Sequence, residues 1–322
     1  MITHPAASLL SHGFDRTDLF LAVYCLVDDW MKQQFGSSNM PRKRRGPRAG
    51  EITDSEILTV ILTGELCHVQ RERAWLRQVR ASYLHLFPAL PEESRFCRRS
   101  QAVRHLFRPL RQAVLFWADV DCEPVRLFDS FPMPLCACYR IRQSSQPISG
   151  SAFGYNSSKR QYFFGLHPGL LVTGTGFIED IVLAPGNCSD ITLLSAYLDQ
   201  CIDEGRDLSH QEWAMDKGFF SKPLKQEASR RTGVNLMARQ RDYGLKEGEQ
   251  PPFWQQMLDQ LRKPIEGIIS VLTECFGMEH LLVKTEWGIY RRAEAKITAF
   301  SIARYFNQVL NLEPMNIARY AV

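Results

Sequence analysis

Near residue 121 the sequence changes from helical periodicity to short apolar segments, and this change constrains the fold more than any other feature. Short apolar segments bounded by Gly, Pro and polar residues predict β-strands. Such segments are "PVRLFD", "QYFFG", "LLVTG", "GFIEDIVLAPG", "EWAMD" and "VNLMA". Helices are predicted over residues 190–205, 221–233 and 263–277. Strands first, followed by alternating helix and strand, predict an α/β fold with a mixed sheet covered by helices.

The part of the chain before this change is predicted to be helical. Apolar residues recur at helical spacing after Asp15 and again after Thr53. Glu56, three residues beyond Thr53, completes a capping box, which is a signal for the start of a helix. Further helices are predicted around residues 75–84 and 100–117. We therefore predict that this part of the chain is a separate, all-helical region.

The helical part carries many arginines and few acids between residues 71 and 111. The arginines are Arg71, Arg73, Arg77, Arg80, Arg95, Arg98, Arg99, Arg104, Arg108 and Arg111, against Glu72, Glu92 and Glu93. A basic loop at 41–50 adds Arg44 and Arg45. A solvated helix surface is the ordinary explanation. The imbalance favours binding to nucleic acid, because guanidinium groups match phosphate geometry, and Arg44, Arg45, Arg77 and Arg99 are the candidate contacts.

Length and composition bound the class of protein. Because 322 residues exceed one average domain, we predict two: a helical, basic, DNA-binding domain over 1–120 and an α/β domain over 121–322. The nine cysteines show no regular framework, and no apolar run reaches the roughly 18 residues of a membrane span. The first residues lack the apolar core of a signal peptide. We therefore expect a cytoplasmic protein without a membrane partner.

Three acidic residues lie at the ends or starts of predicted elements. Asp129 ends one predicted strand, Asp216 ends another, and Glu266 lies in the first turn of the helix predicted over 263–277. Taken singly, such residues are more often turn formers, helix caps or partners of the helix dipole. If the two strands are neighbours, however, their carboxylates repel each other unless a cation lies between them. Oxygen ligands favour Mg²⁺ or Mn²⁺ over zinc, so the three acids predict a divalent metal site.

Five sequence blocks, taken in order, point to a known family. They are "DSFPMPLC", "GYNSSKRQYFFG", "LAPGNCSD", "MDKGFF" and "RKPIEGIIS" with the following "CFGMEHLLVKTEWG". Together they resemble bacterial insertion-sequence transposases of the DDE class, in particular the IS982 family. The resemblance implies a ribonuclease-H-like mixed sheet with flanking helices, preceded by an all-helical N-terminal domain that binds DNA. It also implies that Asp129, Asp216 and Glu266 are catalytic and hold the metal.

The activity implied by this resemblance is DNA transposition. The enzyme would be a nuclease and strand transferase that cleaves phosphodiester bonds at transposon ends and joins the 3′-hydroxyl to target DNA, with two Mg²⁺ (or Mn²⁺) ions per active site. Its partners would be double-stranded DNA, as terminal repeats and target, and a second copy of the chain, at the bacterial nucleoid. Candidate phosphate contacts are Lys159, Arg160, Lys217 and Arg239, although ordinary surface charge explains each equally well.

Two other functions stay open on the sequence. Pro264 lies where the family usually has a basic residue, and His167 begins an interruption of an expected strand. These departures favour, as the alternative, a catalytically impaired DNA-binding protein derived from a transposase. The third function is a metal-dependent hydrolase of small phosphate esters, which would not need an extended basic surface. The phosphate-loop, dinucleotide and nucleophile-elbow motifs G-x-x-x-x-G-K-[ST], G-x-G-x-x-G and G-x-S-x-G do not occur in the sequence.

Overall fold

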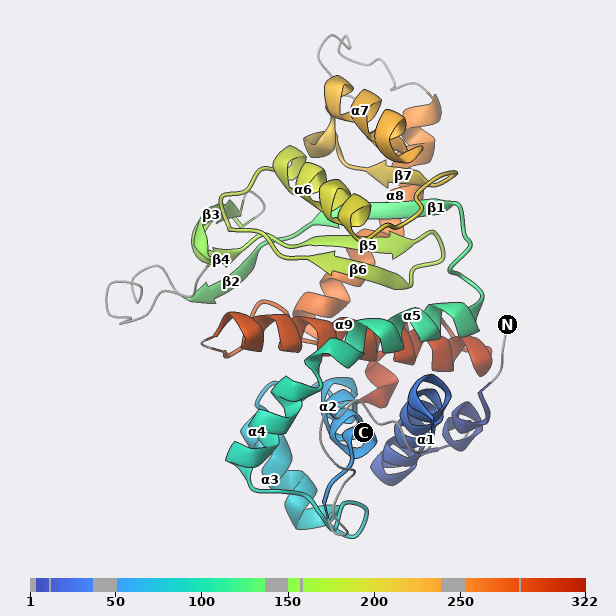
Figure 1. Cartoon of the computed structure of the whole chain (residues 1–322), viewed down its shortest axis with the longest axis vertical. Helices are drawn as coiled ribbons and strands as arrows, with labels where there is room; N and C mark the ends of the chain where they lie inside the picture. Colours follow the sequence, from blue (N-terminus) through green and yellow to red (C-terminus); the bar gives the residue numbers. More distant parts are fainter. Residues whose placement is uncertain are drawn as a thin grey trace. The chain divides into compact units, whose positions relative to one another are not determined.

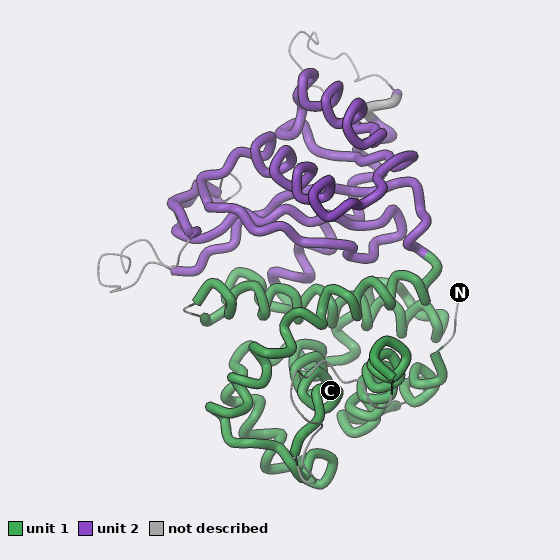
Figure 2. Tube along the Cα trace, viewed as in Figure 1, with its two compact units in different colours: residues 1–119, 274–322 green, residues 120–273 purple. Residues whose placement is uncertain are grey.

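The chain divides into two compact units (Figure 2). The computed structural model describes residues 4–11, 13–36, 51–136, 150–156, 159–238, 253–283 and 285–322. Unit 1 comprises Met1–Asp119 and Glu274–Val322, and unit 2 comprises Val120–Thr273. The sequence predicted a division into 1–120 and 121–322. In the structure, residues 274–322 cluster instead with the helices of the first 119 residues.

Unit 1 is built of helices (Figure 1). They are α1 (Arg16–Phe35), α2 (Asp54–Leu66), α3 (Glu72–Ser82), α4 (Glu93–Ala102), α5 (Phe107–Ala118) and α9 (Glu286–Val309), with short 3-10 helices at Pro5–Leu10, Arg104–Leu106 and Ala318–Tyr320. Capping boxes at Asp15 and Thr53 begin α1 and α2; the sequence predicted the box at Thr53, and for the first helix it predicted a cap at either Thr17 or Asp15. α9 packs against α2, α4 and α5, and every residue from Arg291 to Asn307 is buried. α9 is therefore the central helix of unit 1.

The central helix buries charged side chains, and those side chains pair with residues of α2 and α3. Glu65 lies 2.7 Å from Arg292 and 2.7 Å from Lys296, and Arg291 binds Glu72 through two contacts of 2.8 and 2.9 Å. Charges are tolerated in a protein interior when they are paired and hydrogen-bonded. Burial nevertheless lowers the pKa of Lys296 to about 8. Ion pairs thus join the beginning and the end of the chain within unit 1.

Unit 2 contains a mixed five-stranded sheet. Its strands are β1 (Val125–Ser130), β5 (Gly169–Thr173), β6 (Ile178–Val182), β7 (Glu212–Met215) and β8 (Asn235–Ala238), in the order β6-β5-β1-β7-β8 (Figure 1). β5 is antiparallel to β1 and β6, whereas β7 is parallel to β1 and β8. This mixed sheet with its helices confirms the predicted α/β class.

Three helices accompany the main sheet. α6 (Asp190–Asp203) and α7 (Lys222–Thr232) lie on one side, and α8 (Phe253–Glu274) passes behind the strands (Figure 1). The core beneath α6 contains a buried aromatic stack, in which the Phe128 ring lies 5.6 Å from Tyr197 and 6.0 Å from Trp213.

Over the described ranges of both units, no helix combines the length and the apolar composition that crossing a membrane requires.

Helix α8 differs from its prediction at its start. It begins at Phe253 rather than near Lys263, so Pro264 and Glu266 lie inside the helix and not in its first turn. A proline inside a helix removes one main-chain hydrogen bond and crowds the preceding turn. Ile265, Ile268 and Leu272, which recur at helical spacing, nevertheless form a buried apolar stripe on α8. Packing of this stripe stabilises the helix through Pro264.

A second, three-stranded sheet in unit 2 was predicted only in part. Its strands are β2 (Met133–Cys136), β3 (Ala152–Asn156) and β4 (Gln161–Leu166), in the antiparallel order β2-β4-β3. The sequence predicted β4 alone. Pro134 in β2 and Gly154 in β3 explain this, because both residue types lower strand propensity.

Candidate active site

Two aspartates leave the main sheet side by side. β1 and β7 are parallel neighbours, and Phe128 lies opposite Met215 in their register. Asp129 and Asp216 are the next residues along the two strands, so both lie at the same edge of the sheet. The sequence set the adjacency of these two strands only as a condition, and the structure meets it. The chain then turns into a short 3-10 helix, Lys217–Phe219, directly after Asp216.

Helix α8 brings two further side chains to this edge. Arg262 and Glu266 lie one helical turn apart, with Arg262 Nη2 3.9 Å from Glu266 Oε1. Arg262 Nη2 also lies 3.1 Å from Asp129 Oδ2, and Arg262 Nη1 lies 3.2 Å from Asp216 Oδ1. One guanidinium therefore contacts carboxylates from β1, from the end of β7 and from α8.

The four side chains differ in exposure. Arg262 exposes 9% of its side chain and Asp129 exposes 16%, whereas Asp216 exposes 41% and Glu266 65%. Among the residues that the structure describes, the buried Nε of Arg262 has no hydrogen-bond partner. The cluster is thus closed around Asp129 and open to solvent at Glu266. A large substrate can reach it from the open side.

The ionisation of Asp129 reflects this burial. Burial raises the pKa of Asp129 to about 6, well above the ordinary value of 3.8. The charge of Arg262 and the N–H of Ser130, which donates to Asp129 Oδ1 at 2.8 Å, oppose the rise, and nearby Asp216 adds to it. One guanidinium therefore does not compensate fully for the buried carboxylate. A partner of higher charge would lower this pKa further.

A comparison with known protein families gives a match for this chain. The transposase DDE domain matches residues 121–302, more than half of the sequence. The chain belongs to this family. No curated protein and no solved structure matches it. The matched range of this DDE transposase contains all three carboxylates and Arg262.

The cluster offers a divalent cation oxygen ligands only. Carboxylates are the ligands that Mg²⁺ and Mn²⁺ prefer. In the described part of the chain, however, no three His, Cys, Asp or Glu side chains converge closely enough to hold a metal ion. The Arg262 guanidinium lies between the carboxylates instead. The residues of this transposase thus fit the metal by their chemistry, and the metal would take the place of the guanidinium.

Sequence reasoning missed Arg262. The residue lies four positions before Glu266 in the block "RKPIEGIIS", and an Arg–Glu pair at this spacing shares one face of a helix. That spacing could have predicted that Arg262 lies beside Glu266. It was not used because the helix was expected to begin at Lys263, which would have left Arg262 outside the helix.

A fourth carboxylate of the transposase lies next to the cluster. Asp190 begins α6, and its Oδ1 accepts a hydrogen bond from Ser130 Oγ at 2.7 Å. His167 Nε2 lies 3.7 Å from the same oxygen. A Cβ atom at Gly218 would lie 2.3 Å from Asp190 Oδ2, so the chain after β7 passes very close to this side chain. Asp190 therefore contacts both the last residue of β1 and the segment after β7.

The predicted phosphate contacts of unit 2 lie at exposed positions where they are described. Lys159 and Arg160 are exposed at the turn between β3 and β4, and Lys217 is exposed directly after Asp216. Arg239 lies outside the described residues, as do Arg44 and Arg45 of the basic loop. Their roles as DNA contacts stay predictions.

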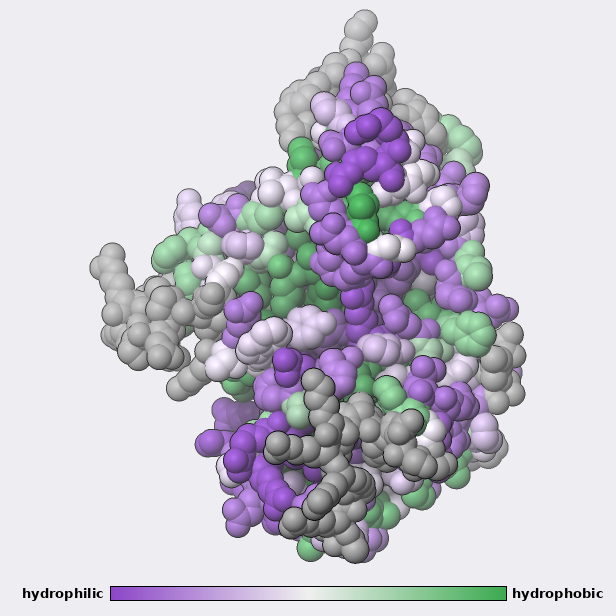
Figure 3. All heavy atoms as spheres, in the orientation of Figure 1, coloured by the Kyte–Doolittle hydropathy of each residue, from purple (hydrophilic) through white to green (hydrophobic). Residues whose placement is uncertain are grey.

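The two predicted contacts of unit 1 differ in their surroundings. Arg77 is exposed on α3, and its Nε donates to the Arg73 carbonyl at 3.4 Å. Arg99 of α4 is largely buried and lies 2.6 Å from Asp54. Hydrophilic side chains gather over α3 and α4 (Figure 3). Arg77 is therefore available to a partner of unit 1, whereas Arg99 holds α4 against the start of α2.

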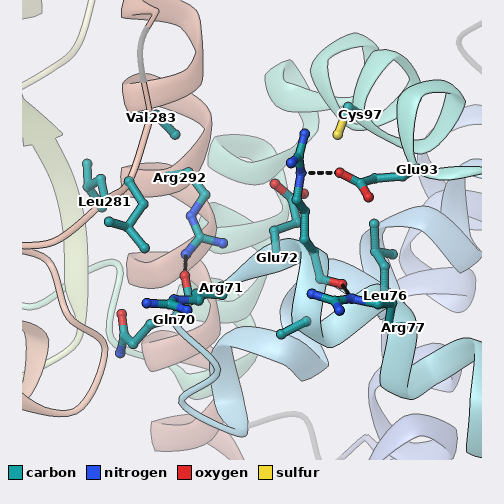
Figure 4. A pocket seen from close by; sticks show the side chains of 13 residues that line it. Gln70, Arg71, Glu72, Leu76, Arg77, Glu93, Cys97, Leu281, Val283 and Arg292 are labelled. Atoms are coloured by element: carbon teal, nitrogen blue, oxygen red, sulfur yellow. Dashed lines mark hydrogen bonds and ion pairs between the residues drawn. The ribbon is translucent and has the colours of Figure 1, made fainter.

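A pocket of about 400 Å³ lies beside α3 in unit 1 (Figure 4). Its charged and polar lining consists of Gln70, Arg71, Glu72, Arg73, Arg77, Glu93 and Arg292. Within it Arg73 pairs with Glu93, and Arg292 donates to the Gln70 carbonyl at 3.1 Å. Four arginines against two glutamates give the walls a positive balance, which favours an anionic partner.

Proposed function

We propose that this DDE transposase is an active nuclease and strand transferase that cleaves phosphodiester bonds at transposon ends and joins the freed 3′-hydroxyl to target DNA. Asp129, Asp216 and Glu266 are the proposed catalytic carboxylates. One observation carries this proposal: the three side chains come from β1, β7 and α8, yet they contact one cationic group. Structural caps and turn residues have no reason to share a cation in this way.

The proposed carboxylates would hold Mg²⁺ or Mn²⁺, with two ions per active site. Bound divalent ions lower the pKa of an attacking water and neutralise charge on the leaving 3′-oxygen. The chain's own residues prepare the site. The Ser130 N–H and Arg262 orient Asp129, whereas Asp216 and Glu266 are more exposed and can turn toward a ligand. Positioning of this kind supplies much of the rate of phosphoryl transfer.

Arg262 holds the carboxylates together in the absence of a divalent cation. Its two Nη atoms neutralise Asp129 and Asp216, but its buried Nε lacks a hydrogen-bond partner among the described residues. An unsatisfied buried donor costs about 1–3 kcal/mol. Because the guanidinium is an incomplete substitute, a divalent ion can displace it.

The proposal extends to the fold of unit 2, to DNA binding by unit 1, and to the subfamily and oligomeric state of the chain. The antiparallel order β6-β5-β1 followed by parallel β7 and β8 supports a ribonuclease-H-like core in unit 2. The arginines of α3 and α4 and the pocket beside α3 support DNA binding by unit 1. Membership of the IS982 family and a homodimer on DNA complete the proposal, and they rest on the sequence blocks and on the need to hold two transposon ends.

The test is cleavage of DNA by the purified chain. A supercoiled plasmid carrying the ends of the element should be nicked in Mg²⁺, and Asp129→Ala should abolish nicking while DNA binding in EDTA persists. Asp203→Ala, an exposed acid at the end of α6, is the matched control and should nick at the parent rate. Equal nicking by Asp129→Ala and the parent would refute the assignment.

A catalytically impaired DNA-binding protein is the second candidate, and Arg262 is the observation that favours it. If the three ion pairs of Arg262 are permanent, they exclude a metal and leave only binding. A band shift with the element ends in EDTA, together with no product in either Mg²⁺ or Mn²⁺, would identify this function.

A further inference from the structure

The hairpin of β3 and β4 exposes three aromatic side chains on one face. Phe153, Tyr155 and Tyr162 expose 56%, 54% and 69% of their surface. Tyr155 lies opposite Tyr162 in the register, with ring centroids 5.0 Å apart, and Phe153 lies opposite Phe164 at 5.2 Å. Residues two apart on a strand share a face, so these rings form one surface. Exposed apolar patches of this kind mark interaction sites.

The opposite face of the hairpin is closely packed, which fixes the aromatic face outward. A Cβ atom at Gly154 would lie 2.3 Å from the Gly186 carbonyl oxygen, and one at Gly186 would lie 2.6 Å from the Ala152 carbonyl oxygen. Main chain therefore approaches main chain on that side. A one-residue shift of the hairpin would drive side chains into this contact. The exposed rings are thus a property of the fold and not of a loose segment.

The turn of the hairpin is basic. Lys159 and Arg160 are both exposed there, and no Asp or Glu occurs from Ala152 to Leu166. Protein–protein interface cores are depleted of charge, whereas grooves that bind single-stranded nucleic acid combine basic groups with aromatic rings. The chemistry of this face favours DNA over a second protein surface.

The hairpin is attached at the sheet edge where Asp129 lies. β4 leads through His167 and Pro168 into β5, and the Phe131 N–H donates to the Pro168 carbonyl at 3.1 Å. Figure 1 shows β2, β3 and β4 together at one end of the main strands. The six residues of β4 extend about 20 Å at roughly 3.3 Å each. That length corresponds to about six base-pair steps of duplex DNA.

We propose that this aromatic face, Phe153, Tyr155 and Tyr162, binds unpaired DNA bases within a few nucleotides of the cleavage site. The inference rests on the proposed function, because it assigns a subsite of the same reaction. Stacked bases inside a duplex do not offer their faces to a protein, whereas unpaired bases stack on exposed rings. Lys159 and Arg160 would contact the phosphates of the same strand.

The experiment measures binding in EDTA, so that it does not depend on cleavage. The probes are a fluorescein-labelled 20-nucleotide oligo(dT) and a labelled 20-base-pair duplex, followed by anisotropy. Tyr155→Ala/Tyr162→Ala should weaken oligo(dT) binding by about tenfold or more, since one stacked base contributes about 5- to 150-fold. Duplex binding should change by less than about twofold.

Two controls separate stacking from general damage. Tyr155→Phe/Tyr162→Phe keeps both rings and should restore oligo(dT) binding. Phe116→Ala removes a ring that is 58% exposed on α5 of unit 1 and should change neither affinity. All variants should keep the parent circular dichroism spectrum and melting temperature. A strand substituted with 5-iodouracil should crosslink to Tyr155 or Tyr162 under long-wavelength ultraviolet light.

Several outcomes would overturn the proposal. They are unchanged oligo(dT) binding by Tyr155→Ala/Tyr162→Ala, an equal loss of duplex binding, and a dimeric parent that this variant converts to a monomer. The last result would identify a contact between copies of the chain. If any of these results occurs while plasmid nicking is normal, the stacking subsite is refuted and the proposed enzymatic function stands. If the parent binds oligo(dT) but does not nick the plasmid in Mg²⁺ or Mn²⁺, the proposed enzymatic function is refuted and the aromatic binding face stands.

Discussion

Arg262 Nη2 and Asp129 Oδ2 lie 3.1 Å apart, although 133 positions separate the two residues in the chain. The contact joins α8 to the end of β1 and puts a fixed positive charge among the carboxylates that we propose as metal ligands. A metal ion held by the same carboxylates would lie close to the guanidinium, and two neighbouring cations repel each other in a partly buried site. Metal binding therefore requires that the guanidinium move away, and the two should compete.

Arg262→Gln should bind Mn²⁺ more tightly than the parent in the absence of DNA. The variant has no cation to displace, so we expect an affinity gain of about tenfold, or about 1.4 kcal/mol. Isothermal titration calorimetry at pH 7.5 measures it. Arg230→Gln on the exposed side of α7 is the matched control and should bind as the parent does. Equal or weaker binding by Arg262→Gln would show that the guanidinium supports the metal site instead of filling it.

Asp129→Asn should change how stability depends on pH. The pKa of Asp129 is about 6 in the folded state against 3.8 ordinarily, so the folded state binds this proton more tightly than the unfolded state does. Its contribution is fully present below pH 3.8 and is lost as the pH rises through 6. The asparagine does not titrate, so the variant does not lose this contribution. The unfolding free energy of the variant minus that of the parent should therefore increase by about 2–3 kcal/mol between pH 4 and pH 7.

Urea denaturation of parent and variant at both pH values measures this difference. Asp203→Asn, at an exposed position, should show a pH-independent difference within about 0.5 kcal/mol. A flat difference for Asp129→Asn would mean that Arg262 compensates fully for the burial of the carboxylate.

Local sequence signals were sufficient for the two aspartates. Asp129 is the next-to-last residue of β1 and Asp216 directly follows β7, and the apolar residues that precede them, Leu127 and Phe128 in β1 and Trp213, Ala214 and Met215 in β7, are buried as the pattern predicts. The alternation of strand and helix begins only at α6, so it favours parallel pairing of β7 with β8, whereas the place of β7 beside β1 depends on contacts distant in sequence. The strand positions of Asp129 and Asp216 could therefore be predicted, whereas their meeting at one edge of the sheet was only conditional on the two strands being neighbours.

Other features depended on contacts distant in sequence. A proline near a helix start is the usual local signal, so Pro264 led to a start at Lys263, whereas burial of Leu258 extends α8 back to Phe253. The place of α9 in unit 1 depends on pairs such as Glu65 with Lys296, and no local pattern encodes them. The position of Arg262 among three acids could not be predicted, because it depends both on the true start of α8 and on contacts distant in sequence.

Gly218→Ala should act through Asp190. The added Cβ would lie 2.3 Å from Asp190 Oδ2, so the carboxylate must move and lose its hydrogen bond from Ser130. We expect a cost of about 1 kcal/mol in unfolding free energy and slower nicking. In an Asp190→Ala background the same change should cost less than about 0.5 kcal/mol. A double-mutant cycle by urea denaturation gives the coupling, and strictly additive effects would contradict the link.

Arg77→Ala and Arg99→Ala should separate DNA affinity from stability. Arg77 is exposed, so its removal should weaken duplex binding several-fold and reduce the salt slope by about 1. Arg99 is paired with Asp54, and the two side chains expose 21% and 7%, so its removal should cost about 1–3 kcal/mol of stability and leave affinity within about twofold. Anisotropy at several salt concentrations and urea denaturation measure the two effects. The reverse pattern would place Arg99 at the DNA.

The central position of α9 has a consequence for how the protein is made. On the ribosome, α1 to α5 emerge before α9, the helix on which α2, α4 and α5 pack, and all strands of unit 2 lie between them in the chain. α8, with Arg262 and Glu266, likewise appears only after every strand of the main sheet. A nascent chain therefore has neither a closed helical core nor a complete set of acids, and a premature stop codon before residue 286 would release a product that lacks the core of unit 1.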